Sequence, residues 1–174
     1  MCDRGFTEAN PEYMKLADIR ISPEIQDKLI KGISELLGGV DIAIETPKRG
    51  IPNDDTWISV WKVGDDLNIW NNRVCTFSMS EFPGCCGIVI SHNTTVYKKY
   101  EGKGINTFLQ EIKEDIAVSN GYSKMLATVV STNEAEIHIL EKAGWRKALE
   151  FVNKRTGNTV LTYLKDITAL LKGE

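Results

Sequence analysis

The stretch that most constrains the fold is Val96–Asn106, where an extended run leads through two glycines into a helical pattern. Residues 85–98, which lead into it, are rich in β-branched side chains and predict a strand. Residues 105–117, which follow the glycines, place their apolar side chains on one helical face. Such a junction points unpaired backbone N–H groups at one spot, where the helix dipole also favours an anion. The stretch therefore indicates either a phosphate cradle or an ordinary glycine turn.

The composition is that of a single globular domain. The chain has 174 residues, of which 42% are apolar and 26% charged, enough for one hydrophobic core. We expect one domain over 1–174, with a loosely held segment at 1–13. The net charge of −3, without a basic cluster, argues against nucleic acid as a partner. No apolar run reaches the roughly 18 residues that span a membrane, so no membrane partner is expected, and monomer and homodimer stay open.

The four cysteines predict neither a metal site nor a disulfide framework. Cys2, Cys75, Cys85 and Cys86 lack the paired spacing of zinc ligands, so we expect no metal. The N-terminus lacks the apolar core of a secretory signal, and a cytoplasmic location with reduced thiols is the expectation. Cys85 and Cys86 begin the predicted strand, where they would alternate between its two faces as packing residues.

The rest of the chain alternates between helical and extended patterns. Ser22 and Pro23 are typical of a helix start, and Gly38 with Gly39 of its end. The run at 125–130 is apolar without alternation, which predicts a strand covered on both faces. Helices are expected at 23–37, 105–119, 134–143 and 166–172. Strands or extended segments are expected at 14–21, 40–46, 57–63, 74–82, 85–98, 125–130, 148–152 and 159–164.

Three segments between residues 88 and 165 together resemble the GCN5-related N-acetyltransferase (GNAT) superfamily. The first is Val96-x-Lys98-x-Tyr100-Glu101-Gly102-Lys103-Gly104-Ile105, which is similar to the strand-to-helix acetyl-CoA motif of the family. The second is Asn133 followed by a helix that ends Leu140-Glu141-Lys142-Ala143-Gly144-Trp145. The third is the hairpin from Lys147 to Lys165. Their order and spacing agree with the family, which makes the glycine turn a specific signal.

The resemblance implies an α/β (α+β) GNAT fold. Its central sheet would be mixed, mostly antiparallel and twisted, with helices on both faces and a V-shaped splay between the two central strands. Pantetheine would lie in that gap, and the pyrophosphate of acetyl-CoA on the amides of the glycine turn. Lys103 would add charge or be solvated, and Asn133 would cap a helix as well as reach the cofactor. The implied cofactor-binding residues are Val96, Tyr97, Lys98, Gly102, Lys103, Gly104, Ile105, Asn106 and Asn133.

Three positions depart from the family pattern. Glu101 stands where the family has Arg or Gln, and its carboxylate would repel a pyrophosphate unless it turns to solvent. Asn106 stands where a Gly or Ala is usual. Leu140 replaces the tyrosine that protonates the leaving thiolate in many members, so it cannot act as an acid.

The expected activity is transfer of an acetyl group from acetyl-CoA to a primary amine of a small molecule, a lysine or a protein N-terminus. His92 is the candidate base, since a neutral imidazole suits proton transfer near pH 7, although a histidine in a strand is also typical of a hydrogen-bonded sheet residue. Ser131, at the end of a strand beside the acyl site, would order a water or donate to the thiolate. The alternative is a non-enzymatic GNAT-fold protein that senses acyl-CoA or binds a protein partner.

Overall fold

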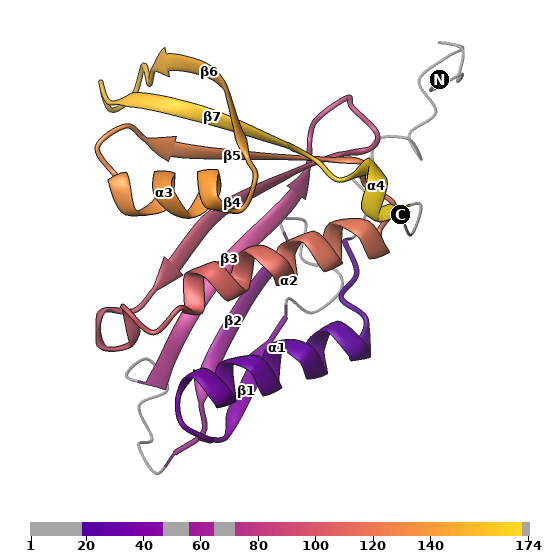
Figure 1. Ribbon diagram of the computed structural model, residues 1–174, viewed down its shortest axis with the longest axis vertical. Coiled ribbons are helices and arrows are strands. Elements are labelled where there is room, and N and C mark those ends of the chain that lie inside the picture. Colours follow the sequence, from indigo (N-terminus) through magenta and orange to yellow (C-terminus); the bar gives the residue numbers. More distant parts are fainter. Residues whose placement is uncertain (1–18, 47–55, 65–71, 172–174) are drawn as a thin grey trace.

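The computed structural model describes residues 19–46, 56–64 and 72–171, and within them the chain forms one seven-stranded sheet (Figure 1). The strand order is β1-β2-β3-β4-β5-β7-β6, and every neighbouring pair is antiparallel except β4 and β5, which are parallel. This is the mixed, mostly antiparallel sheet that the sequence predicts. The strands are β1 Ile42–Glu45, β2 Thr56–Lys62, β3 Arg73–Glu81, β4 Ile88–Val96, β5 Lys124–Val130, β6 Arg146–Val152 and β7 Thr159–Asp166.

The helices begin and end close to the residues that the sequence indicates. They are α1 Pro23–Leu36, α2 Ile105–Ser119, α3 Glu134–Lys142 and α4 Thr168–Leu171, with a 3₁₀ turn, η3, at Lys98–Tyr100. At the start of α1, the Ser22 hydroxyl accepts a hydrogen bond from the Ile25 N–H at 3.3 Å, which satisfies one unpaired donor of the first turn. The capping prediction at Ser22 is therefore confirmed.

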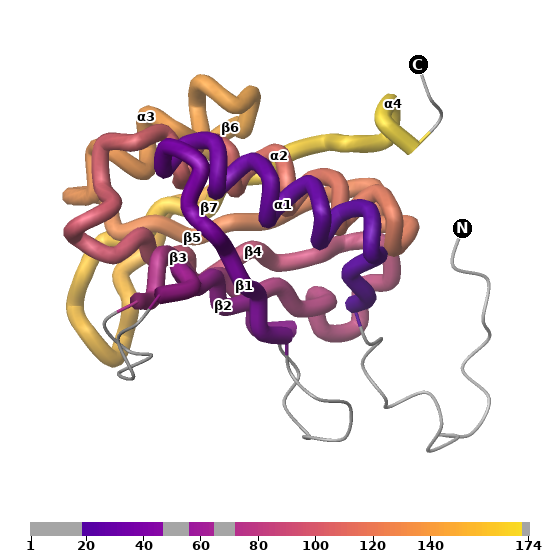
Figure 2. Tube along the Cα trace, turned by 90° about the horizontal axis from the view of Figure 1, so that it is seen from below, coloured from indigo at the N-terminus to yellow at the C-terminus, as the bar shows by residue number. Residues whose placement is uncertain are grey.

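The three longer helices cover the same face of the sheet, whereas helices on both faces were expected. Lys165 of β7 donates to Glu114 Oε1 of α2 at 2.6 Å and to the Ala143 carbonyl at the end of α3 at 2.7 Å. Gly32 of α1 faces the Phe108 ring of α2 so closely that a Cβ would lie 2.1 Å from its Cζ. Figure 2 shows α1, α2 and α3 on one side of β1–β4. The connections from β4 to β5 and from β5 to β6 run in one direction along the sheet, and because such crossovers are almost always right-handed, both helices are expected on one face.

The hydrophobic core lies between this face and the helices. Ile112 and Ile116 of α2 are fully buried, as are Val89 of β4 and Met125 of β5. The expectation that β5 is covered on both faces is wrong. Its alternate residues Met125, Ala127 and Val129 are buried, while Thr128 and Val130 are exposed.

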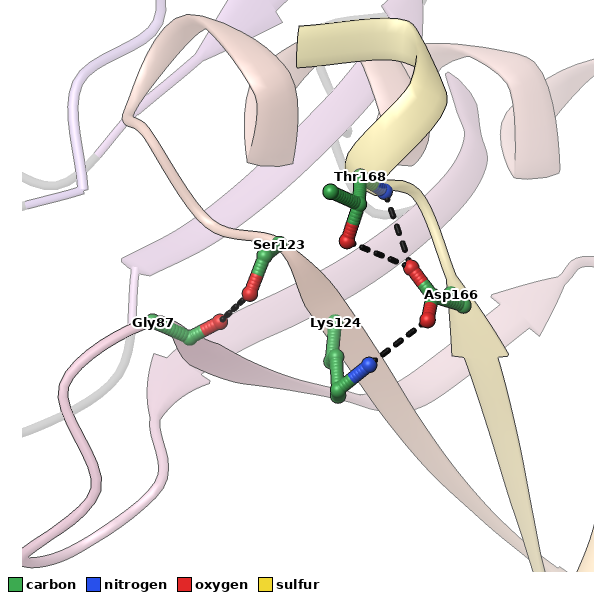
Figure 3. A network of polar contacts seen from close by, with 5 residues as sticks. All are labelled: Gly87, Ser123, Lys124, Asp166 and Thr168. Atoms are coloured by element: carbon green, nitrogen blue, oxygen red, sulfur yellow. Dashed lines mark hydrogen bonds and ion pairs between the residues drawn. The ribbon is translucent and has the colours of Figure 1, made fainter. Parts of the chain in front are cut away.

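One end of the parallel β4–β5 pair is fastened by polar contacts (Figure 3). Ser123, just before β5, donates from its hydroxyl to the Gly87 carbonyl before β4 at 3.3 Å. Lys124 pairs with Asp166 at 2.7 Å, and Asp166 also accepts hydrogen bonds from the backbone and hydroxyl of Thr168. The hydrogen bond from Lys124, with those from Thr168, lowers the pKa of the Asp166 carboxyl. The three strands β4, β5 and β7 are thus held in register at this end.

The connection from β3 to β4 differs from the sequence prediction. Cys85 and Cys86 were expected in a strand, but they lie in the turn before β4 and are exposed. Pro83 and Gly84 begin a longer turn than expected, and β4 starts only at Ile88. Of the strand expected at 14–21, residues 14–18 lie outside the described residues, and 19–21 have no regular secondary structure.

Candidate functional site

The two central strands separate halfway along their length. Pairing between β4 and β5 runs from Ile88 with Lys124 to Ser91 with Ala127, and then stops. A cavity of about 240 Å³ opens at this point. It is lined by β4, β5, α2 and α3, and its wall includes His92, Thr94, Gln110, Asn133, Glu136 and Leu140. The V-shaped splay that the sequence resemblance implies is therefore present.

A β-bulge in β4 shapes the edge of this cavity. Thr76 of β3 pairs with Thr95 and Ser78 with His92, so two residues of β4, Asn93 and Thr94, oppose one residue of β3. Asn93 has a φ of +52°, in the left-handed region that asparagine tolerates better than most residues. The bulge lies directly beyond the last β4–β5 pair, and the backbone there turns away from the regular ladder.

His92 lies on the cavity wall with hydrogen bonds at both ring nitrogens. Ser80 Oγ lies 3.2 Å from Nε2, and Asn93 Nδ2 lies 3.0 Å from Nδ1. Because an amide nitrogen only donates, this network assigns the ring hydrogen to Nε2 and the accepting lone pair to Nδ1. His92 can accept a substrate proton at Nδ1 only when Asn93 gives up its bond.

The glycine turn presents an open helix N-terminus. Gly102 and Gly104 have φ of +72° and +80°, and Gly104 is the N-cap of α2, with no side chain capping the first turn. A Cβ at Gly102 would meet no atom within 4 Å, so the space in front of the turn is free for a ligand. Lys103 is exposed, and so is Glu101, which accords with a Glu101 carboxylate turned to solvent. The first-turn donors and the helix dipole give this turn the geometry with which helix N-termini bind anions.

The residues on either side of the glycines have different roles. Val96 is half-buried at the end of β4, and Lys98 is exposed in η3. Tyr97 points to β3: its N–H donates to the Val74 carbonyl at 3.0 Å, and its hydroxyl accepts from Arg73 at 2.9 Å. Ile105 is buried, with 2% of its surface exposed, and anchors α2 in the core. The side chains of Tyr97 and Ile105 therefore do not line the cavity, and their assignment as cofactor-binding residues stays a prediction.

Asn106 and Asn133 are linked through Glu136. Asn106 Nδ2 donates to the Glu136 carboxylate, which joins α2 to α3. Asn133 Oδ1 accepts from the Glu136 N–H at 3.2 Å and caps α3, while Asn133 itself lines the cavity. The capping expectation for Asn133 is confirmed. Asn106 Oδ1 is buried without a partner in the described structure.

Ser131 is not brought to the cavity wall. It follows β5, and its backbone N–H donates to the Thr159 carbonyl at 2.9 Å. The lining of the cavity includes Val130 and Asn133 but not Ser131. Its assignment as a catalytic residue thus stays a prediction from sequence.

Two buried polar residues of α2 were missed in the sequence. Gln110 lines the cavity and is 2% exposed, and neither atom of its amide has a partner in the described structure. Lys113, one turn further, is 1% exposed and donates to the Thr94 hydroxyl at 2.7 Å. Burial lowers the pKa of Lys113 to about 8, while the nearby Glu136 and Cys75 act in the opposite direction. The signal was available, since position 113 falls on the same helical face as Leu109 and Ile116.

Other classes of site are not found in the described ranges. No group of three or more His, Cys, Asp or Glu there could hold a metal ion. No helix in residues 19–46, 56–64 or 72–171 is long and apolar enough to cross a membrane.

Solved structures of GNAT acetyltransferases share this fold. The spermidine/spermine N-acetyltransferase SpeG from Vibrio cholerae, solved with manganese ions, has a TM-score of 0.60 and 12% sequence identity, covering 76% of this chain and 96% of that one. The IAA acetyltransferase from Bacillus cereus has a TM-score of 0.55 at 14% identity, covering 72% and 99%. A GNAT-family acetyltransferase from Streptococcus pneumoniae has a TM-score of 0.52 at 16% identity, covering 66% and 67%.

SpeG has also been solved in complex with CoA and spermine, and that structure matches this chain with a TM-score of 0.56 at 12% identity, covering 73% of this chain and 96% of that one. Neither a protein-family model nor a curated protein sequence matches the chain. At these identities the comparisons show the fold, and the fold is that of the GNAT acetyltransferases.

Proposed function

We propose that this GNAT-fold chain is an N-acetyltransferase that transfers an acetyl group from acetyl-CoA to a primary amine. The observation that carries the proposal is the alignment of three features along one path. These are the uncapped N-terminus of α2 at Gly104, the β4–β5 gap beyond Ser91, and the cavity at the bulge. A long ligand with a phosphate at one end and a reactive thioester at the other fits this sequence of sites.

The residues present fit the phosphate end of acetyl-CoA. Gly102 and Gly104 are both left-handed, and at Gly102 a Cβ would meet no atom within 4 Å, which leaves free space beside the backbone donors of the turn. Lys98 and Lys103 flank the turn and are exposed, so their charges can adjust to a bound diphosphate. Asn133 lines the cavity, and Asn106 Oδ1, in the first turn of α2, is buried without a partner in the described structure.

The thioester end would lie where β4 and β5 have separated. Backbone groups of both strands beyond Ser91 and Ala127 no longer pair with each other, so an extended pantetheine arm can bond to them in place of a strand. Acetyl-CoA supplies an activated acyl group. The chain holds amine and thioester together, and this positioning accounts for much of the rate in such a reaction.

The acceptor is a primary amine of a small molecule, a lysine or a protein N-terminus. His92 and its partner Asn93 lie on the cavity wall, where an incoming amine would lose its proton. The SpeG complex with spermine makes polyamines a rational first probe for the acceptor, alongside peptides with free N-termini or lysines.

The proposal is tested by two measurements on the purified chain. Acetyl-CoA at millimolar concentration should raise the melting temperature, because a ligand that binds only the folded state stabilises it by mass action. CoA release should then exceed the rate without acceptor for at least one amine in a panel of spermidine, spermine, monoamines and peptides. The absence of both a thermal shift and amine-dependent CoA release would refute the proposal.

A second function is favoured by one observation. Leu140 lines the cavity and is 1% exposed, at the position where many GNAT enzymes place a tyrosine acid. A chain that binds acyl-CoA as a sensor, without turning it over, needs no acid there. A thermal shift with acetyl-CoA combined with no CoA release for any amine would support this sensor function instead.

A further inference from the structure

The proposed reaction needs a proton for the sulfur that leaves the thioester, and the usual position cannot supply one. Leu140 is apolar and buried in the cavity wall. The assigned hydrogen of His92 lies on Nε2, which is paired with Ser80 on β3. A hydroxyl that lines the cavity and is itself polarised would be a suitable donor.

Thr94 meets both conditions. It lines the cavity at the bulge of β4, and its Oγ1 accepts a hydrogen bond from the Lys113 ammonium at 2.7 Å. Because Oγ1 is the acceptor in that bond, the hydrogen of the hydroxyl is available for another partner. Within the described chain the Thr94 hydroxyl makes no other hydrogen bond, and an ammonium behind a hydroxyl makes it a stronger donor.

Lys113 is an unusual residue for the interior of α2. Its side chain is fully buried, and in the described structure its ammonium contacts only Thr94 and, at 5.8 Å, the Phe77 ring. A buried ammonium without a carboxylate at bonding distance costs free energy, so its presence calls for a role other than stability. The charged or titratable groups nearest to it on other elements are Glu136 of α3 and Cys75 of β3.

We propose that the Thr94 hydroxyl protonates the departing CoA thiolate and that Lys113, acting through Thr94, is the positioning residue that supplies the replacement proton. This inference rests on the proposed acetyltransferase function. As the amine nitrogen bonds to the carbonyl carbon, the C–S bond breaks and its electron pair stays on sulfur. The sulfur takes the Thr94 hydrogen, Thr94 takes one from the Lys113 ammonium, and Lys113 is left neutral. The proton lost by the acceptor nitrogen goes to His92 Nδ1 and from there to solvent, and Lys113 regains one through Thr94 after CoA leaves.

The acidities of the partners agree with this path. Burial lowers the pKa of Lys113 to about 8, so its ammonium is a stronger proton donor than an ordinary lysine. An unperturbed lysine, with a pKa of 10.5, would be a weaker proton donor to a thiolate. The burial that makes Lys113 costly to the fold therefore also makes it a suitable proton source.

The test compares Thr94→Val, Thr94→Ser and Lys113→Met with the wild type, using acetyl-CoA and the amine that gives the fastest CoA release. Thr94→Val should lower kcat by about 100-fold with little change in the KM for acetyl-CoA, and Thr94→Ser, which keeps a hydroxyl, should restore most of it. The wild-type kcat should fall above pH 8 as Lys113 loses its proton. That alkaline decline should be missing in Lys113→Met.

The matched control is Thr95→Val, which makes the same change at the next position, exposed and outside the cavity lining. It should keep wild-type kcat and pH profile. If wild type and Thr94→Val had equal kcat values and calorimetry showed that both bind CoA, the proposed proton relay from Lys113 through Thr94 would be overturned. The proposed acetyltransferase function would still stand. A loss in Thr94→Val that Thr94→Ser does not restore would also overturn the relay. A wild type that releases no CoA with any amine would overturn the proposed function and the relay together.

Discussion

Ser91 of β4 and Ala127 of β5 form the last residue pair of the parallel ladder, although β4 continues to Val96 and β5 to Val130. The separation is built into the sheet, because at the other end Ser123 and Lys124 tie β5 to its neighbours while the bulge at Asn93 diverts β4. The cavity at the open end is therefore a fixed feature of the fold.

Gly104→Val should weaken CoA binding while leaving the chain folded. A valine at φ +80° is strained by about 1–2 kcal/mol and tilts the first-turn donors of α2, and each lost phosphate hydrogen bond costs about 1.5–3 kcal/mol. We expect at least about a tenfold rise in Kd, measured by calorimetry with CoA. Gly84→Val is the matched control, since Gly84 has φ +74° in the distant β3–β4 turn. Equal Kd values for the two variants would show that the turn does not bind the phosphates.

The fold was predictable because its signals are local. The Ser22 cap, the glycines after α1 and the β-branched run of β4 each act within a few residues, and the structure reproduces their elements. The side on which a helix packs is not local, since it depends on the handedness of the crossovers, and here the expectation was wrong. Cys85 and Cys86 were misplaced because β-propensity does not distinguish the last residue of a long turn from the first residue of a strand.

Gln110→Leu should stabilise the folded chain. This result would show that the Gln110 amide does not serve stability, and would favour a role in binding. Both amide atoms of Gln110 are buried without a partner in the described structure, and removing such groups gains about 1–3 kcal/mol. The free energy of unfolding in urea measures this. Gln26→Leu is the control, because the Gln26 amide donates to the Ile21 carbonyl at 3.0 Å and its loss should be destabilising or neutral. A destabilised Gln110→Leu would indicate that the amide is satisfied by ordered water.

The stability of the chain should rise as the pH increases from about 8 to 10.5. The folded-state pKa of Lys113 is lowered to about 8 from an ordinary 10.5, so in this window the unfolded chain binds a proton that the folded chain has released. Stability then increases with pH, by about 3 kcal/mol at most from this residue. Urea unfolding at pH 7.5 and 10 measures the change. Lys113→Met should be more stable at pH 7.5 and should lack the rise; a parallel rise in the variant would assign it to other groups.

The parts of the site that depend on backbone geometry could be predicted from the sequence. The parts that depend on contacts between distant side chains could not. The glycine turn and Asn133 lie where the sequence indicates, because turn geometry and helix capping leave a local signature. Thr94 and Lys113 are 19 residues apart and come into contact only after α2 packs on β4, so no local sequence motif indicates the pair. Lys113 could have been found as a charge on an apolar helical face, but its partner could not.

His92→Ala should lower turnover without weakening CoA binding, whereas His138→Ala should change neither. His92 lines the cavity and accepts from Asn93 at Nδ1, the atom that would receive the proton of the incoming amine, while His138 is exposed on α3. Loss of a general base typically costs about 100-fold or more in kcat. Initial rates of CoA release across pH 6–9, with calorimetric Kd values for CoA, separate the two effects. A kcat in His92→Ala equal to that of His138→Ala at every pH would remove His92 from the reaction and leave Asn93 and the backbone at the bulge to orient the amine.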